Sequence, residues 1–83
     1  MQSLSPKDYG LNSKVKLIQS DDHIGIIIDR KSRIIMKDGI RILDQVNKIK
    51  KNTNHVIRLY TSAPVCSKTK VFLNKHDILI DSI

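Results

Sequence analysis

Apolar residues in the first third of the chain follow strand-like patterns. Residues 15–19 alternate between the two faces and predict a short strand, and residues 20–23 carry turn-forming aspartates. Residues 24–29 form a β-branched apolar run, typical of a strand covered on both faces. Residues 30–32 interrupt this run and residues 33–37 resume it. The spacing therefore predicts a hairpin made by residues 24–29 and 33–37.

From Asp38 onward the apolar pattern becomes helical. Asp38 is suited to the N-cap position, and Asp44 and Lys48 are spaced for a favourable i,i+4 ion pair. Residues 52–54 are polar and end the helix. The apolar stripe consists of residues at intervals of three, with one more on its shoulder: Ile40, Leu43, Val46 and Ile49, with Ile42 beside them.

The second half of the chain predicts two more strands with a helix between them. Residues 55–60 are mostly apolar, and Pro64 suits the first turn of a helix over residues 65–75. Residues 77–81 form the last strand. The predicted order is β-β-β-α-β-α-β, in which the last three elements make a parallel β-α-β unit. We expect an α/β (α+β) domain with a small mixed sheet and two helices packed on it.

Length and composition narrow the class of protein. The 83 residues suffice for one domain, which we assign to residues 14–83, after a loose lead-in over residues 1–13. The sequence shows neither a membrane span nor a signal peptide, so we expect a cytoplasmic protein that does not enter membranes. Its one cysteine excludes an internal disulfide and a Cys-rich zinc site, and we expect no metal and no cofactor.

The charge is strongly positive. Lys and Arg number 15 against 8 acidic residues, which gives a net charge of +7. Two clusters stand out and predict a basic patch: Arg30, Lys31 and Arg33, and Lys48, Lys50 and Lys51. Such a patch favours nucleic acid as the partner, or an acidic protein surface. Two tyrosines and one phenylalanine are too few for a base-stacking platform.

One segment combines several chemically useful side chains. The strand over residues 55–60 points its carboxyl end at the start of the second helix, where ligands often bind in α/β sheets. Cys66 should lie in the first turn of that helix, where exposed amides and nearby lysines lower a thiol pKa. The same amides could instead hold an anion. The candidate anion-binding residues are Thr61, Ser62, Ser67 and Lys68.

Residues 56–80, including the run Tyr60-Thr61-Ser62-Ala63-Pro64-Val65-Cys66, resemble the first β-α-β unit of glutaredoxins and other thioredoxin-like proteins. The resemblance places Ala63 where that family has its attacking cysteine and Cys66 at the resolving cysteine. A second register makes Cys66 the nucleophile of a Cys-x-x-Thr motif that ends at Thr69. In the family a hairpin and a helix follow this unit, whereas here they precede it, as in a circular permutation. The resemblance implies a thioredoxin-like fold and monothiol redox chemistry at Cys66.

Three interpretations follow from the sequence. The first is a small non-catalytic binding module that engages an anionic macromolecule through its basic surface. The second is a thioredoxin-like thiol protein centred on Cys66, which is otherwise a small buried residue. The third is a structural subunit of a homo- or hetero-oligomer, because so small a core is marginal alone. The three histidines fall at element boundaries, where surface or capping roles are expected.

Overall fold

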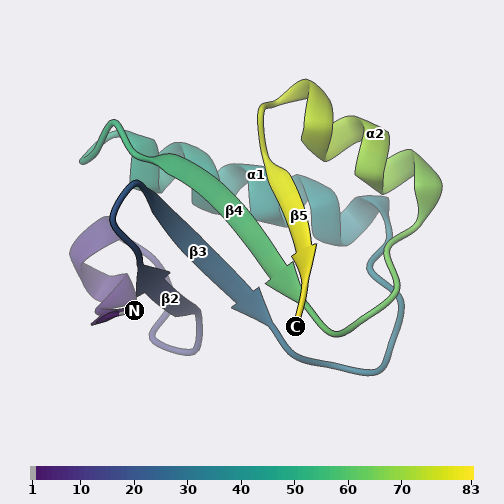
Figure 1. The fold of residues 1–83 in the computed structure, drawn as a ribbon, viewed down its shortest axis with the longest axis horizontal. Helices are drawn as coiled ribbons and strands as arrows, with labels where there is room; N and C mark the ends of the chain where they lie inside the picture. Colours follow the sequence, from purple (N-terminus) through teal and green to yellow (C-terminus); the bar gives the residue numbers. More distant parts are fainter. Residues whose placement is uncertain (1) are drawn as a thin grey trace.

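A five-stranded sheet and two helices make up residues 2–83, the part of the chain described by this computed structural model (Figure 1). The strands are β1 (Gln2–Leu4), β2 (Lys16–Gln19), β3 (His23–Ile28), β4 (Val56–Thr61) and β5 (Leu79–Ser82). The helices are α1 (Met36–Lys50) and α2 (Ser67–Lys75), with a short 3-10 helix, η1 (Pro6–Tyr9), after β1. The predicted order β-β-β-α-β-α-β is confirmed, although the first three strands are not all formed by the residues expected.

The strands lie in the sheet in their sequence order. β1 pairs antiparallel with β2, and β2 pairs antiparallel with β3. The hairpin is therefore formed by β2 and β3, which residues 20–22 connect, and not by residues 24–29 and 33–37. β3, β4 and β5 pair in parallel, which confirms the predicted parallel β-α-β unit in the second half of the chain. The carboxyl ends of three parallel strands therefore lie along one edge of the sheet, and both helices start from that edge.

The two helices cover one face of the sheet. α1 runs behind the strands in Figure 1 and packs against α2. Along β4 the residues Ile57 and Leu59 are fully buried, whereas Val56 is half exposed and Arg58 and Tyr60 are only partly buried. This two-residue alternation marks a sheet with one covered face and one open face. The sequence predicts that both faces of the strand at residues 24–29 are covered. In the described part of the chain, helices cover only one of these faces.

The buried stripe of α1 differs from the predicted one. Ile42, Val46 and Ile49 are buried, whereas Ile40 is 58% exposed. Residues three apart fall about 60° short of a full turn, so a strict interval of three drifts around the helix. Intervals of four and then three keep Ile42, Val46 and Ile49 on one side.

A close approach between the helices occurs at Gly39. A Cβ atom there would lie 2.9 Å from Cγ2 of Thr69 and 3.5 Å from the Phe72 ring. The absence of a side chain at this position thus lets the first turns of α1 and α2 meet.

No helix within residues 2–83 is long and apolar enough to cross a membrane.

The predicted strand over residues 33–37 is wrong. Only Ile34 makes a bridge, parallel to Val65, and α1 already begins at Met36. The side chain of Arg30 donates hydrogen bonds to the carbonyl oxygens of Ser32 and Arg33 at 3.2 and 3.1 Å. Because these carbonyls are occupied by Arg30, the segment forms a fixed loop and not the second strand of a hairpin.

The N-terminal segment is also more ordered than the predicted loose lead-in. Residues 2–4 pair with β2 as an edge strand, and Leu11 belongs to the buried core. The segment is short and mostly polar, so its pairing depends on β2 and not on a pattern of its own. At the other end of the chain, helix α2 begins at Ser67, so Pro64 precedes the helix and does not lie in its first turn.

Candidate anion-binding site at the carboxyl edge of the sheet

The loops that follow β3 and β4 are tied together at this edge. The Ile34 amide donates to the Pro64 carbonyl at 2.8 Å, and the Cys66 amide donates to the Ile34 carbonyl at 2.9 Å. The side chain of Ile34 is fully buried beneath this bridge. The two loops are thereby fixed beside each other, and both lead into helix starts.

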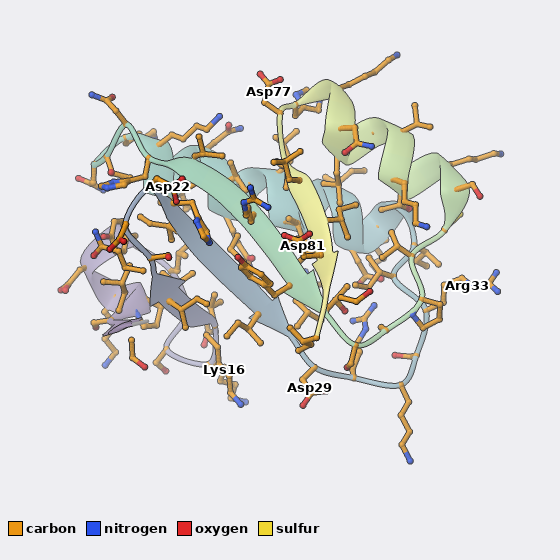
Figure 2. The ribbon with its side chains drawn as sticks, viewed as in Figure 1. Lys16, Asp22, Asp29, Arg33, Asp77 and Asp81 are labelled. Carbon is orange, nitrogen blue, oxygen red and sulfur yellow. The ribbon has the colours of Figure 1, made fainter. Side chains whose placement is uncertain are left out.

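A hollow of about 500 Å³ lies at the start of α2. Its lining contains Arg33 from the β3–α1 loop and Lys68 from the first turn of α2, with residues 64–67 between them. Figure 2 shows Arg33 and Asp29 at this edge, with Asp22 and Asp77 at the opposite edge. Cys66, Ser67 and Lys68, which are neighbours in the sequence, line this hollow together with Arg33.

The other two predicted anion-binding residues do not join the hollow. Thr61 is buried, and its hydroxyl oxygen accepts a hydrogen bond from the Ala63 amide at 3.0 Å. Ser62 donates its hydroxyl to a carboxylate oxygen of Asp29 at 2.6 Å. Both hydroxyls therefore stabilise the loops at this edge, and neither residue lines the hollow at the start of α2.

Cys66 occupies the N-cap position of α2, one residue before the predicted first turn, and is half-buried. The backbone amides of Lys68 and Thr69, which face the sulfur, lower the pKa of the Cys66 thiol, and the charge of Arg33 lowers it further. The fully buried hydroxyl of Thr69, which has no other hydrogen-bond partner, also favours the thiolate. The start of α2 is therefore a site that stabilises negative charge.

The predicted basic patch is divided in two. Arg30, Lys31 and Arg33 precede α1, whereas Lys48, Lys50 and Lys51 lie at its far end. The 15 residues of α1 span about 22 Å, so the two clusters cannot form one surface. Arg30 also pairs with Asp38 at 2.6 Å and Lys48 with Asp44 at 3.4 Å. Lys31, Arg33 and Lys68 remain exposed and outside the ion pairs of residues 2–83.

A polar chain on the open face of the sheet was not foreseen from the sequence. Nε2 of His23 lies 2.6 Å from the Tyr60 hydroxyl, and Nδ1 of His23 lies 2.9 Å from a carboxylate oxygen of Asp22. The hydrogen bond from His23 lowers the pKa of Asp22. The Tyr60 ring lies over Gly25, where a Cβ atom would be 2.6 Å away. The glycine within an otherwise branched strand was the one signal in the sequence for this close approach.

Beside Tyr60 the open face carries an ion pair between Arg58 and Asp81 at 2.8 Å. These two charges neutralise each other. Within residues 2–83 no group of three or more histidine, cysteine or acidic side chains is placed to hold a metal ion.

Comparisons with protein-family models, with curated proteins and with solved structures give no match to this chain. The function must therefore be argued from the geometry of the site itself.

Proposed function

We propose that this protein is a small non-catalytic binding module that engages nucleic acid through the carboxyl edge of its sheet. The observation that carries the proposal is the shared hollow in which Arg33, Lys68 and the first turn of α2 meet. Phosphate groups are bound by basic side chains together with the amides of a helix start. The net charge of +7 supplies a long-range attraction for the same partner.

The surroundings of the hollow favour an anionic ligand. Among the groups near it, Asp29 is held by Ser62 and Asp38 by Arg30. Lys31, Arg33 and Lys68 have no such partner in the described part of the chain, and the start of α2 has no side-chain cap. A run of phosphates would contact these three cations in turn, whereas the scarcity of aromatic side chains argues against base stacking.

A salt titration with a fluorescent single-stranded oligonucleotide tests this proposal. Each phosphate contact contributes about 0.7 to the slope of log K against log salt for a single strand. The double variant Arg33→Gln with Lys68→Gln should lower that slope by about 1.4. The matched control, Lys50→Gln with Lys51→Gln at the far end of α1, should leave most of the slope unchanged.

The outcomes separate the possible partners. Absence of oligonucleotide binding at about 50 mM salt would overturn the proposal, because phosphate-driven affinity is strongest at low salt. Equal binding of polyglutamate and the oligonucleotide would instead indicate an acidic protein surface as the partner.

The lowered thiol pKa favours a second candidate function, thioredoxin-like monothiol chemistry at Cys66. The support is the position of Cys66 at a helix start within a parallel β-α-β unit, together with the resemblance over residues 56–80. In such a reaction the Cys66 thiolate attacks the glutathione sulfur of a protein–glutathione mixed disulfide, forms its own mixed disulfide with glutathione and releases the protein thiolate. A second glutathione thiolate then restores Cys66 and releases glutathione disulfide.

The pH dependence of Cys66 alkylation tests this second candidate. A reactive thiol should show an apparent pKa below the ordinary value of about 8.5. A value at or above it would argue that Cys66 has only a packing role.

The open sheet face supports the third proposal, a subunit of an oligomer. Val56 and Leu79 on that face are 50% and 44% exposed. Sedimentation at micromolar concentration should then show a species larger than the monomer, and a strictly monomeric protein would exclude self-association.

A further inference from the structure

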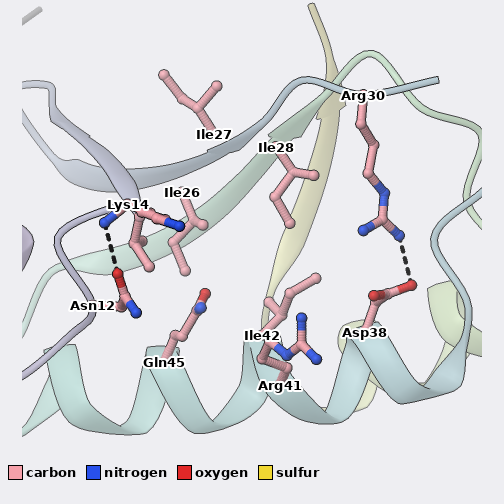
Figure 3. A pocket seen from close by; sticks show the side chains of 11 residues that line it. Asn12, Lys14, Ile26, Ile27, Ile28, Arg30, Asp38, Arg41, Ile42 and Gln45 are labelled. Carbon is pink, nitrogen blue, oxygen red and sulfur yellow. Dashed lines mark hydrogen bonds and ion pairs between the residues drawn. The ribbon is translucent and has the colours of Figure 1, made fainter. Parts of the chain in front are cut away.

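A second cavity lies between β3 and the first half of α1, away from the hollow at Cys66. Its volume is about 470 Å³, which falls in the range of small-molecule pockets. The segment over residues 12–15 closes its other side. In Figure 3 Ile26 and Ile28 point from β3 toward α1, whereas Ile27 points away.

The walls of the cavity combine an apolar floor with charged groups above it. Ile26, Ile28 and Ile42 supply the apolar surface. Lys14 and Arg41 also line the cavity, Lys14 from the segment beside Asn12 and Arg41 from α1 (Figure 3). Neither cation belongs to an ion pair of residues 2–83. The third cation, Arg30, is already paired with the only carboxylate in the lining, that of Asp38.

Gln45 gives the cavity a specific polar requirement. Its side-chain oxygen Oε1 is covered, yet it accepts no hydrogen bond. Buried polar atoms of folded proteins are paired with few exceptions, because an unpaired one costs free energy. Figure 3 shows the Gln45 side chain directed from α1 into the space below Lys14. Because Oε1 is shielded from solvent, the Gln45 side chain must turn toward the cavity before an N–H or O–H group of a ligand could supply the missing donor.

We propose that this cavity binds a small organic oxyanion with an apolar body and one hydrogen-bond donor. The oxyanion lies between Lys14 and Arg41, whose guanidinium can make paired hydrogen bonds to a carboxylate or a phosphate. The apolar body packs on Ile26, Ile28 and Ile42, and the donor bonds to Oε1 of Gln45 after that side chain turns toward the cavity. This site is independent of the proposed nucleic-acid interface, because its residues do not line the hollow at Cys66.

Isothermal titration calorimetry with matched probes tests this inference. Indole-3-acetate carries a carboxylate and an N–H donor, and adenosine 5′-monophosphate carries a phosphate and an amino donor. Each is compared with its uncharged counterpart, indole-3-acetamide or adenosine. We expect the charged member of at least one pair to bind about tenfold more tightly, and the pair that does so identifies the oxyanion.

Variants then assign the contacts. Arg41→Gln should remove most of the preference for the charged probe, whereas the control Lys50→Gln at the far end of α1 should retain it. Gln45→Met should weaken the preferred probe and leave an analogue without its donor, such as benzofuran-3-acetate for indole-3-acetate, unaffected. Circular dichroism establishes that each variant is folded.

Two results would overturn the inference. One is the absence of binding by both charged probes at millimolar concentration. The other is binding that neither Arg41→Gln nor Gln45→Met alters in the folded variants, because the ligand would then occupy another place on the protein.

Discussion

The starts of α1 and α2 lie at the same edge of the sheet but satisfy their free amides in different ways. At α1 the carboxylate of Asp38 accepts a hydrogen bond from the Ile35 amide at 3.0 Å and one from Arg30 at 2.6 Å. At α2 the capping residue is Cys66, and the nearest charged side chains are the cations Arg33 and Lys68. The start of α1 carries a carboxylate of its own chain, whereas the start of α2 carries cations and retains a capacity for negative charge.

This difference separates a structural feature from a candidate binding site. Asp38 is the third residue of α1 and reaches back to the amide that precedes the helix, as glutamate does in a capping box. A ligand anion would be redundant there. At α2 an oxyanion would find amides and cations without a carboxylate in the lining of the hollow.

The largest expected effect follows from breaking the bridge that both helix starts share. Ile34→Ala removes a fully buried side chain and should lower the free energy of unfolding by about 3 kcal/mol, measured by urea denaturation. The neighbouring Ile35→Ala, at a residue 49% exposed, should change it by less than about 0.5 kcal/mol. Equal effects of the two substitutions would mean that the bridge at residue 34 is not a fixed part of the core.

A smaller effect is expected at the start of α1. Asp38→Asn removes the charge that accepts from both Arg30 and the Ile35 amide, and should lower the free energy of unfolding by about 1 kcal/mol at pH 7. Asp44→Asn, which breaks only the exposed pair with Lys48, should cost at most about 0.5 kcal/mol. If Asp44→Asn proved the more costly, the assigned role of Asp38 would be wrong.

The contribution of Asp38 should also depend on pH. The hydrogen bond from Arg30, followed by that from the Ile35 amide, holds the pKa of Asp38 below its ordinary value. A carboxylate with a lowered folded-state pKa stabilises the fold fully above its unfolded pKa of about 3.9. The difference between wild type and Asp38→Asn should therefore shrink as the pH falls from that value through the folded pKa. A difference that persisted under more acidic conditions would contradict an electrostatic origin.

Substitutions at the start of α2 should weaken ligand binding and leave the stability of the fold nearly unchanged, unlike those at the start of α1. The double variant Arg33→Gln with Lys68→Gln removes two exposed, unpaired cations and should change the free energy of unfolding by less than about 0.5 kcal/mol. The same variant should lose affinity for the oligonucleotide. Thermal denaturation and the binding titration together separate a ligand site from a structural one. A large loss of stability would show that these cations hold the fold.

The smallest effect concerns the thiol itself. The amides of α2 make the larger contribution to the lowered pKa of Cys66, and the charge of Arg33 makes a smaller one. Arg33→Gln should therefore raise that pKa only slightly. Alkylation by iodoacetamide across pH measures it, with Lys50→Gln as the control. A pKa that is the same in wild type and Arg33→Gln would remove Arg33 from the surroundings of the sulfur.

Local patterns in the sequence predict most elements but not the segment that joins the two helix starts. The helical stripe of α1 and the apolar runs of β4 and β5 are visible because many residues repeat one period. Ile34, Ile35 and Met36 also look like a strand, yet the first makes one bridge and the last begins a helix. This conformation depends on the hydrogen bonds that Arg30 donates to the Arg33 carbonyl and to Asp38. The pattern of apolar residues gives no indication of these bonds.

The candidate site was predictable only in part for the same reason. Cys66, Ser67 and Lys68 are neighbours in the chain, so their position at a helix start follows from local sequence. Arg33 joins them through the pairing of Ile34 with Val65, a contact across 31 positions of the chain. Thr61 and Ser62 do not line the hollow: the Thr61 hydroxyl bonds to Ala63 in the loop after β4, and the Ser62 hydroxyl bonds to Asp29 in the segment after β3.

The rate of Cys66 alkylation with and without a bound oligonucleotide tests the central claim most directly, because this thiol lies in the lining of the proposed phosphate site. A phosphate in the hollow should repel the thiolate, raise the pKa of Cys66 and slow its alkylation, and added salt should reverse the effect. An oligonucleotide that binds the protein while Cys66 reacts at an unchanged rate would contradict the claim that nucleic acid is held at the start of α2.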